Sequence, residues 1–305
     1  MKLATVEFEG RERVVAALPE GGLLDLAAAG GDKGSVFADM LTLIEGGETA
    51  LSLARDLIAA AGETARLPVD QVSFRTPIRP VQYRDCLVFE EHLFNCLRAF
   101  GQEQPQLPPV WYEQPIYYKG NRMSFIGHGQ DVIWPEYADH LDIELELAIV
   151  VGKTGRDIPA DQASDYIFGY TILNDVSARD AQMREMPGQL GPAKGKDFDT
   201  GNILSPYILT ADEVAHPVAL DMEARVNGER WGGGNSSSMQ HDFGAILAHI
   251  SASETLYPGE VIGSGTVGTG CGLETGRRLS PGDRFELEIE GIGVLANRIL
   301  RKGPS

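Results

Sequence analysis

The stretch Leu141–Lys153, LDIELELAIVVGK, has the alternating pattern of a buried strand that also carries charge. At the two-residue period of a β-strand, Ile143 and the alternate apolar residues after it share one face, while Glu144 and Glu146 share the other. The two carboxylates are then roughly 7 Å apart. Carboxylates this close either raise the pKa of one of the pair or are neutralised by a cation. The alternative is an edge strand whose glutamates face water.

The composition is that of a globular protein with a strong negative charge. Its 305 residues, 43% hydrophobic and 23% charged, suffice for a small domain and a larger one. The net charge of −18 argues against nucleic acid or an anionic membrane surface as a partner, although a bound cation would still admit an anionic substrate. No apolar run is long enough to span a bilayer, and MKLATVEFEG lacks a signal-peptide core. Because Cys86, Cys96 and Cys271 are not spaced like a zinc or redox motif, we expect reduced thiols and a cytoplasmic location.

The first part of the chain, residues 1–76, is expected to form a small N-terminal α+β domain. Residues 1–18 predict two short strands around a turn, and Ser35–Ile44 and Glu48–Ala61 predict two amphipathic helices. Two prolines in Arg75–Pro80 predict an extended linker, so we place the domain boundary there.

The second part, residues 77–305, is expected to be rich in strands. Asn227-Gly228 is a strong hairpin signal, and Asp242–Ile250 has the apolar spacing of a helix. The stretch Gly263–Gly270 predicts a glycine-rich loop after a strand. It lacks the G-K-[ST] sequence of a nucleotide loop, so close approach of the backbone to a small ligand is the better functional interpretation.

Asp85 and His92 lie in a segment, Asp85–Phe100, whose apolar stripe predicts a helix. They are two turns apart and fall on one edge of that stripe. In one interpretation Asp85 caps the helix and His92 is a core residue. In the other, a carboxylate and an imidazole are presented together to a cleft.

Asp175 follows the predicted strand Tyr166–Leu173, with Arg179 four residues further on. Loops at strand ends often carry ligands, but Asp175 could equally cap a helix that begins at Ser177. Lys196 lies between a glycine and acidic residues, in a segment with neither a helical nor a strand pattern.

Taken together, these motifs resemble those of the fumarylacetoacetate hydrolase family. The matching motifs are Y-R-D-(x)6-H, E-L-E-L-A-I-V-V-G, G-Y-T-x-x-N-D-V-S-A-R-D-x-Q, G-K-D-F-D-T, V-N-G-E and G-S-G-T, spread from Pro77 to Arg301. The resemblance implies an α+β fold with a β-rich catalytic domain of mixed rolled sheets over residues 77–305. It also implies a metal-dependent enzyme that acts on a small-molecule keto acid and is usually a homodimer.

The same resemblance assigns roles to individual residues. The metal ligands would be Asp85, Glu144, Glu146 and Asp175. Four hard oxygens favour Mg²⁺, with Mn²⁺ or Ca²⁺ as alternatives, over zinc. The catalytic residues would be His92 as general base, Glu274 (or Glu254 or Glu260 in its place) as the partner of His92, and Lys196 beside the developing oxyanion. The substrate-binding residues would be Tyr118, Arg179, Gln182 and Thr266.

The function implied is metal-dependent hydrolysis of a C–C bond in a 1,3-diketo (2,4-dioxo) acid, with release of a pyruvate-type enolate. Leu87 and Glu90 stand where fumarylacetoacetate-specific enzymes place a tyrosine and an arginine, so a different 2,4-dioxo acid is expected. The alternatives are an isomerase, decarboxylase or hydratase of a related 2-keto acid, and a metal-stabilised binding protein without activity.

Overall fold

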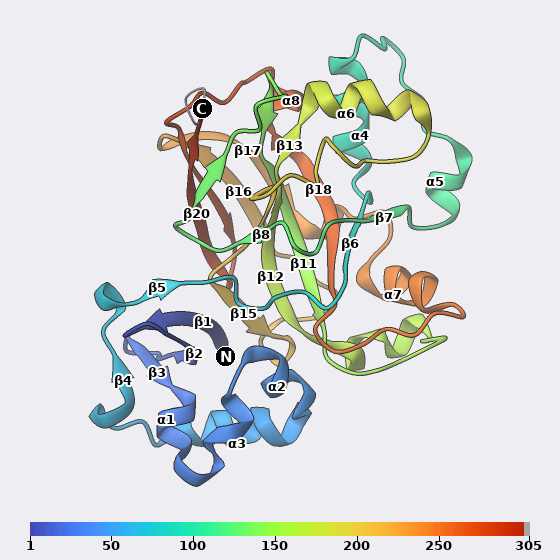
Figure 1. Ribbon diagram of the computed structural model, residues 1–305. Helices are drawn as coiled ribbons and strands as arrows, with labels where there is room; N and C mark the ends of the chain where they lie inside the picture. The colour runs from blue at the N-terminus through green and yellow to red at the C-terminus, as the bar shows by residue number, and fades with distance from the viewer. Residues whose placement is uncertain (302–305) are drawn as a thin grey trace.

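A large sheet runs through the computed structural model, which describes residues 1–301 and has an α+β fold (Figure 1). Strand β11 (Glu144–Val151) lies inside this 13-stranded sheet, between β12 (Ile167–Asp175) and β18 (Val261–Cys271). All the residues of β11 are buried. The interpretation of this stretch as a water-facing edge strand is therefore wrong.

The two faces of β11 belong to different cores. Leu145, Leu147 and Ile149 pack in the core that joins the large sheet to a second sheet. Ala148 and Val150 pack instead against apolar side chains from the first third of the chain. Glu144 and Glu146 continue this second face toward the start of the strand, where the alternation of the sequence puts them.

The main path of the large sheet has the order β4-β3-β2-β1-β15-β12-β11-β18-β6-β7. Its remaining strands are β1 (Lys2–Phe8), β2 (Arg11–Ala17), β3 (Leu23–Asp25), β4 (Arg66–Leu67), β6 (Tyr83–Cys86), β7 (Tyr117–Lys119) and β15 (Tyr207–Thr210), with β5 (Ser73–Phe74), β8 (Phe125–Ile126) and β14 (Asn202–Leu204) off the path. The two strands predicted within residues 1–18 are confirmed. Because β1 pairs with β15, the N-terminal strands continue the same sheet as the later ones.

The second sheet has five strands in the order β17-β16-β19-β20-β9. They are β9 (Asp131–Ile133), β16 (Asp221–Val226), β17 (Glu229–Asn235), β19 (Arg284–Ile289) and β20 (Gly293–Leu300), and a separate pair joins β10 (Leu141–Asp142) to β13 (Ser177–Ala178). The hairpin predicted at Asn227-Gly228 is confirmed, and both residues have the positive φ of such a turn, 52° and 80°.

The helices lie at the ends and edges of the sheets, with the N-terminal elements at one end of the molecule and α4 and α6 at the other (Figure 1). They are α1 (Leu26–Gly30), α2 (Met40–Glu45), α3 (Gly47–Ala59), α4 (Glu90–Ala99), α5 (Pro109–Glu113), α6 (Arg179–Glu185), α7 (Phe243–Ser251) and α8 (Gly272–Thr275). Short 3-10 segments are Gly31–Phe37, Glu63–Ala65, Val69–Gln71, Ala160–Tyr166, Met186–Gly188, Ala211–Glu213 and Ser236–Ser238. Within residues 1–301, no helix combines the length and hydrophobicity needed to cross a membrane.

The helix predictions hold in two places and fail in two. Those over Glu48–Ala61 and Asp242–Ile250 are confirmed as α3 and α7. The helix predicted over Ser35–Ile44 is broken, since the 3-10 segment ends at Phe37 and Asp39, with an extended backbone, caps α2 by accepting a hydrogen bond of 2.8 Å from Thr42 N.

The helix predicted over Asp85–Phe100 is wrong in its first part. Asp85 lies on strand β6, and α4 begins only at Glu90. Likewise, the glycine-rich stretch is not a loop but most of strand β18, which pairs with both β11 and β6. Asp85 is therefore not a helix cap.

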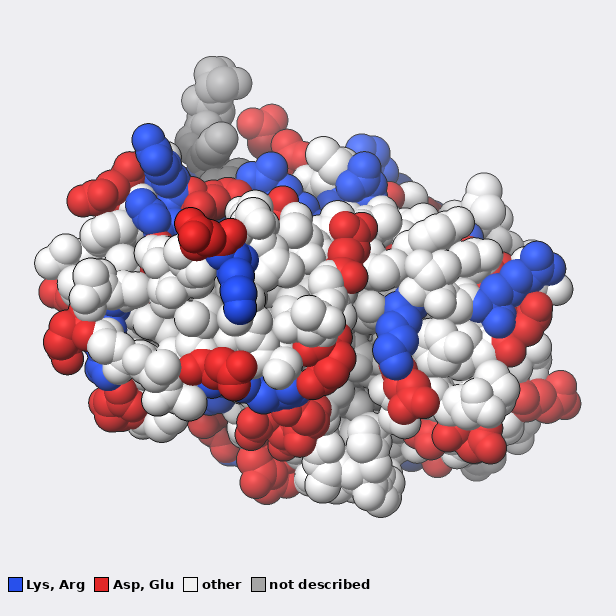
Figure 2. All heavy atoms as spheres, turned by 90° about the horizontal axis from the view of Figure 1, so that it is seen from below, with Lys and Arg blue, Asp and Glu red and all other residues white. Residues whose placement is uncertain are grey.

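Acidic residues dominate the surface charge. Figure 2 shows one face, on which Asp and Glu side chains occur in groups and basic side chains lie mostly singly among them. This distribution agrees with the net charge of −18.

Candidate active site

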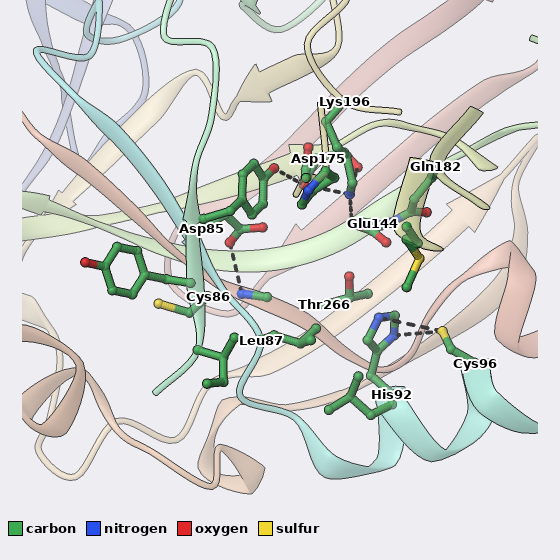
Figure 3. A pocket seen from close by; sticks show the side chains of 18 of the residues that line it. Asp85, Cys86, Leu87, His92, Cys96, Glu144, Asp175, Gln182, Lys196 and Thr266 are labelled. Atoms are coloured by element: carbon green, nitrogen blue, oxygen red, sulfur yellow. Dashed lines mark hydrogen bonds and ion pairs between the residues drawn. The ribbon is translucent and has the colours of Figure 1, made fainter. Parts of the chain in front are cut away.

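A cavity of about 400 Å³ lies where the large sheet meets α4 and α6. All the predicted site residues except Glu274 line it. Figure 3 shows Asp85, Asp175 and Lys196 on one side of this pocket and His92 with Cys96 on the other. The fold thus brings together groups that are up to 181 residues apart in sequence, as Asp85 and Thr266 are.

Three of the four predicted metal ligands form a buried carboxylate cluster, which we define as Asp85, Glu146 and Asp175. One oxygen of each lies within 4.8 Å of the others. The three side chains come from strands β6, β11 and β12 of one sheet. Gly263 on β18 makes room for them, because a Cβ atom there would collide with oxygens of Asp85 and Glu146.

The carboxylate cluster fits a divalent cation. Among residues 1–301, Glu146 Oε2 and Asp175 Oδ1 are buried without a hydrogen-bond partner, which is costly for an oxygen that carries charge. Burial raises the pKa of Asp85 and of Glu146 well above their ordinary values, and in each case a neighbouring carboxylate adds to the rise. Three hard oxygens with unsatisfied capacity are suited to Mg²⁺, Mn²⁺ or Ca²⁺.

Glu144, the fourth predicted ligand, is paired with two basic side chains. Its Oε2 is 2.5 Å from Lys196 Nζ, and its Oε1 is 2.7 Å from Arg179 Nη1. Burial opposes ionisation, but Lys196 and then Arg179 hold the pKa of Glu144 well below its ordinary value. Lys196 also lies 2.6 Å from Asp175 Oδ2, so this lysine joins Glu144 to the carboxylate cluster.

His92 and Glu274 form the predicted pair. Nδ1 of His92, on α4, is 3.1 Å from Oε2 of Glu274, on α8. Burial disfavours the charged imidazole, but the neighbouring Cys271 and Glu274 side chains outweigh it and raise the pKa of His92 to about 10. Glu254 and Glu260 are excluded as the partner of His92, because both bind Arg84.

Glu274 is fixed by groups other than His92. Its oxygens accept hydrogen bonds from the backbone N–H groups of Thr269, at 2.9 Å, and Cys271, at 3.2 Å. Asn95 Nδ2 donates a further bond of 3.2 Å. The carboxylate therefore has a set orientation from which to hold the imidazole of His92.

Two of the predicted substrate-binding residues contact the carboxylate cluster. Tyr118 donates a hydrogen bond of 2.6 Å to Asp175 Oδ2, and Thr266 one of 3.3 Å to Glu146 Oε1. The other two contact each other, since Arg179 Nη1 donates to Gln182 Oε1 at 3.1 Å. All four side chains line the pocket.

Asp142 was missed by the sequence analysis, although it precedes Glu144 and Glu146 in the same alternation. Its Oδ2 accepts hydrogen bonds of 3.0 and 2.9 Å from Arg179 Nε and Nη2. It also accepts bonds from the backbone N–H groups of Gly272 and Leu273, at 2.8 and 2.9 Å. Asp142 thus fixes both Arg179 and the first turn of α8, the helix that carries Glu274.

Part of the pocket lining is apolar, which the sequence did not reveal either. The apolar side chains in it include Leu87, Leu93, Phe100, Ile116, Met186 and Leu190. These side chains come from the β6–α4 connection, from α4 and its C-terminal end, and from the segments before β7 and after α6. They give the pocket apolar surface against which an apolar group can pack.

Known proteins match both this fold and this sequence. The family model described as "Fumarylacetoacetate (FAA) hydrolase C-terminal" matches residues 83–300. The chain belongs to the fumarylacetoacetate hydrolase family. Among its relatives in this family is "Oxaloacetate tautomerase Fahd2a, mitochondrial" of Rattus norvegicus, which is 35% identical over 264 residues, or 86% of this chain and 79% of the relative.

Two solved structures in the family are similar over their whole length. One is a 5-carboxymethyl-2-hydroxymuconate delta-isomerase from Mycobacterium smegmatis, with 27% identity, a TM-score of 0.73 and complete coverage of both chains. The other is a maleylpyruvate hydrolase from Sphingobium sp. SYK-6 in complex with manganese(II) ion and pyruvate, with 25% identity and a TM-score of 0.76 over 99% of this chain and 100% of the other. The family therefore contains both hydrolases and isomerases.

Proposed function

We propose that this protein is a divalent-metal-dependent hydrolase that cleaves the C–C bond of a 2,4-dioxo acid with an apolar acyl group. The observation that carries the proposal is the His92–Glu274 pair at the pocket, 3.1 Å between nitrogen and oxygen, together with the buried carboxylate cluster. A base held by a carboxylate is the arrangement that activates water in hydrolases. The hydrolase relative that binds manganese(II) and pyruvate supports the same chemistry.

Asp85, Glu146 and Asp175 would hold the cation. When bound, a divalent cation supplies Lewis acidity that draws electron density from the 2-oxo group of the substrate. His92 lines the same pocket, so the positive charge of such an ion would lower the pKa of its imidazole and favour the unprotonated form.

His92 removes a proton from water as the water oxygen bonds to C4 of the substrate, and Glu274 stabilises the resulting imidazolium. The C3–C4 bond then breaks, and its electron pair stays on C3 as the enolate of pyruvate, while C4 leaves as a carboxylic acid. Lys196 keeps a fixed positive charge beside Glu144 and Asp175, where it stabilises negative charge that develops on the substrate oxygen. Protonation of C3 yields pyruvate.

The apolar part of the pocket lining supports an uncharged acyl group. Within the described part of the chain, the arginine and lysine that line the pocket are Arg179 and Lys196, and both are already paired with carboxylates. A second carboxylate on the acyl end would lose its hydration without gaining a free basic partner. The apolar side chains of the lining, such as Phe100 and Leu190, instead suit a hydrocarbon chain.

A second candidate is keto–enol tautomerisation of oxaloacetate. It is favoured by the relatives named as oxaloacetate tautomerases, such as the one from Rattus norvegicus, which matches 86% of this chain at 35% identity. That reaction needs proton transfer between an oxygen and C3 but no attack by water. The same cluster and His92 would serve it.

The test is turnover of acylpyruvates with apolar chains of increasing length, of fumarylpyruvate and of oxaloacetate, with Mg²⁺ or Mn²⁺. We expect loss of the ultraviolet band of the diketone enol with stoichiometric pyruvate, fastest for an apolar chain and abolished by a chelator. His92→Gln should reduce hydrolysis by about 10²–10⁴-fold. The matched control is His128→Gln, since His128 lies outside the pocket and accepts a bond from Ala296 N. Faster tautomerisation of oxaloacetate with every acylpyruvate unchanged would replace the proposal by the second candidate.

A further inference from the structure

Beside the carboxylate cluster, the pocket has a second and chemically different group of donors. His92, Cys96 and Cys271 are buried, and one ligand atom of each lies within 4.8 Å of the others. His92 and Cys96 are one helical turn apart on α4, while Cys271 ends β18 at the start of α8. One imidazole and two thiols form a softer set than three carboxylates, and such a set selects zinc rather than magnesium.

The spacing of these donors matches a tetrahedral zinc ion. Zinc bonds of about 2.3 Å to sulfur and 2.0 Å to nitrogen at a tetrahedral angle separate the two ligand atoms by about 3.5 Å. Sγ of Cys96 is 3.7 Å from His92 Nε2. Because this sulfur is also 3.8 Å from Nδ1, the imidazole must rotate for the Nε2 lone pair to point at a shared ion.

The other ring nitrogen of His92 already has the partner that a zinc-binding histidine requires. Histidine ligands usually donate their second N–H to a carboxylate or carbonyl, which fixes the tautomer and the ring orientation. Here Nδ1 lies 3.1 Å from Glu274 Oε2, which leaves Nε2 for the metal. Glu274 is held in turn by two backbone N–H groups, so this outer partner is preorganised.

We propose that His92, Cys96 and Cys271 bind a zinc ion, with water in the fourth position. His92 and Cys96 line the pocket, so an ion can reach the site by the route that the substrate takes. Binding displaces the protons of both thiols into solvent. In a further step that rests on the proposed function, zinc occupies Nε2 of His92 and inhibits the enzyme by removing the base, while Mg²⁺ remains on the carboxylate cluster.

The test is a titration with Co²⁺, a spectroscopic probe for zinc sites, in reduced protein saturated with Mg²⁺. Cobalt bound to thiolates has a near-ultraviolet charge-transfer band that cobalt on carboxylates lacks. We expect this band to reach its maximum at one equivalent and to disappear when Zn²⁺ is added. Cys96→Ser and Cys271→Ser should each weaken Co²⁺ binding by more than about 100-fold, the upper end of the effect of losing an outer partner. Cys86→Ser is the matched control, because Cys86 is buried in the same pocket wall but lies outside the donor group.

A second measurement keeps the test valid if a variant fails to fold. In the unaltered protein, Zn²⁺ should slow alkylation of Cys96 and Cys271, but not of Cys86, in peptides quantified by mass spectrometry. Absence of a thiolate band in the unaltered protein, or equal alkylation of Cys96 and Cys271 with and without Zn²⁺, would overturn the site. A band and thiol protection without any inhibition by Zn²⁺ would leave the site in place and refute the role of His92 as base.

Discussion

Replacement of Glu274 by glutamine tests most directly whether the Glu274 carboxylate sets the pKa of His92, the proposed base. The substitution keeps the shape of the side chain and removes its charge, 3.1 Å from His92 Nδ1. His92 stays buried, and burial by itself lowers the pKa of an imidazole. The pKa of His92 in the Glu274→Gln variant should therefore fall well below about 10, although Cys271, which remains, still raises it.

The expected size of this change follows from the distance. Two unit charges 3.1 Å apart attract each other by about 5 kcal/mol at an effective dielectric constant of about 20. At about 1.4 kcal/mol per pKa unit, this attraction corresponds to nearly four units. This attraction is an upper bound, because Cys271 shares with Glu274 the rise in the pKa of His92 from 6.5 to about 10. Loss of Glu274 should therefore remove at least about one unit of that rise.

The assay is NMR of metal-free protein with ¹⁵N-labelled histidine, titrated from about pH 5 to about pH 11. The six histidines of the chain give few signals, and His92→Gln identifies the one of interest. Glu254→Gln is the matched control, since Glu254 pairs with Arg84 and should leave His92 unchanged. A shift of less than about one unit in Glu274→Gln would refute the reasoning.

The free energy of unfolding should also depend on pH through His92. The folded-state pKa of His92 is raised, so its contribution is fully present below pH 6.5 and is lost as the pH rises through about 10. The unaltered protein should thus lose up to about 5 kcal/mol of unfolding free energy across this window through His92. Urea unfolding of Glu274→Gln should show a smaller component of this kind, and an identical pH dependence in both proteins would contradict the assignment.

Three other substitutions test the rest of the site. Glu146→Gln should weaken Mn²⁺ binding by more than about 100-fold in calorimetry, because the cluster loses one of its three carboxylate ligands; unchanged affinity would contradict the ligand assignment. Gly263→Ala should lower both Tm and Mn²⁺ affinity, since its Cβ collides with carboxylate oxygens, whereas Gly62→Ala, with open space around its Cβ, should change neither. Asp142→Asn leaves Arg179 without its bidentate partner and should cost about 3–5 kcal/mol in urea unfolding, and a loss below about 1 kcal/mol would mean that Glu144 alone holds this arginine.

Local patterns predicted those elements whose structure is decided by neighbours in sequence. The Asn227-Gly228 hairpin follows from backbone conformations that few residues adopt. Asp242, whose side chain accepts a bond of 2.8 Å from Ala245 N, caps α7 where the apolar spacing begins. The alternation in LDIELELAIVVGK predicted a strand with both glutamates on one face, and it left open whether that face met water or a cation.

The errors arose where distant strands decide the conformation. Asp85 precedes a helical apolar stripe, so the local period extended the helix over it, but β6 is drawn into the sheet by parallel pairing with β18. The glycines of β18 resemble a loop for a similar reason. A side chain at Gly263 would collide with two carboxylates, and Gly265, with φ of 83°, passes close to the backbone of Cys86. These contacts join residues that are more than 100 positions apart, and no local pattern records them.

The assignment of a divalent cation rests finally on an imbalance of buried charge. Around the pocket, apart from the His92–Glu274 pair, five buried carboxyl groups face two buried basic side chains, an excess of three negative charges if all are ionised. The carboxyl groups are Asp85, Asp142, Glu144, Glu146 and Asp175, and the basic groups are Arg179 and Lys196. Such an excess is unstable unless protons or a cation relieve it, and the raised pKa values of Asp85 and Glu146 favour uptake of protons by the metal-free cluster. A divalent cation on the cluster would displace these protons and reduce the excess to one, so the folded chain stores binding energy for the ion in the repulsion between its own carboxylates.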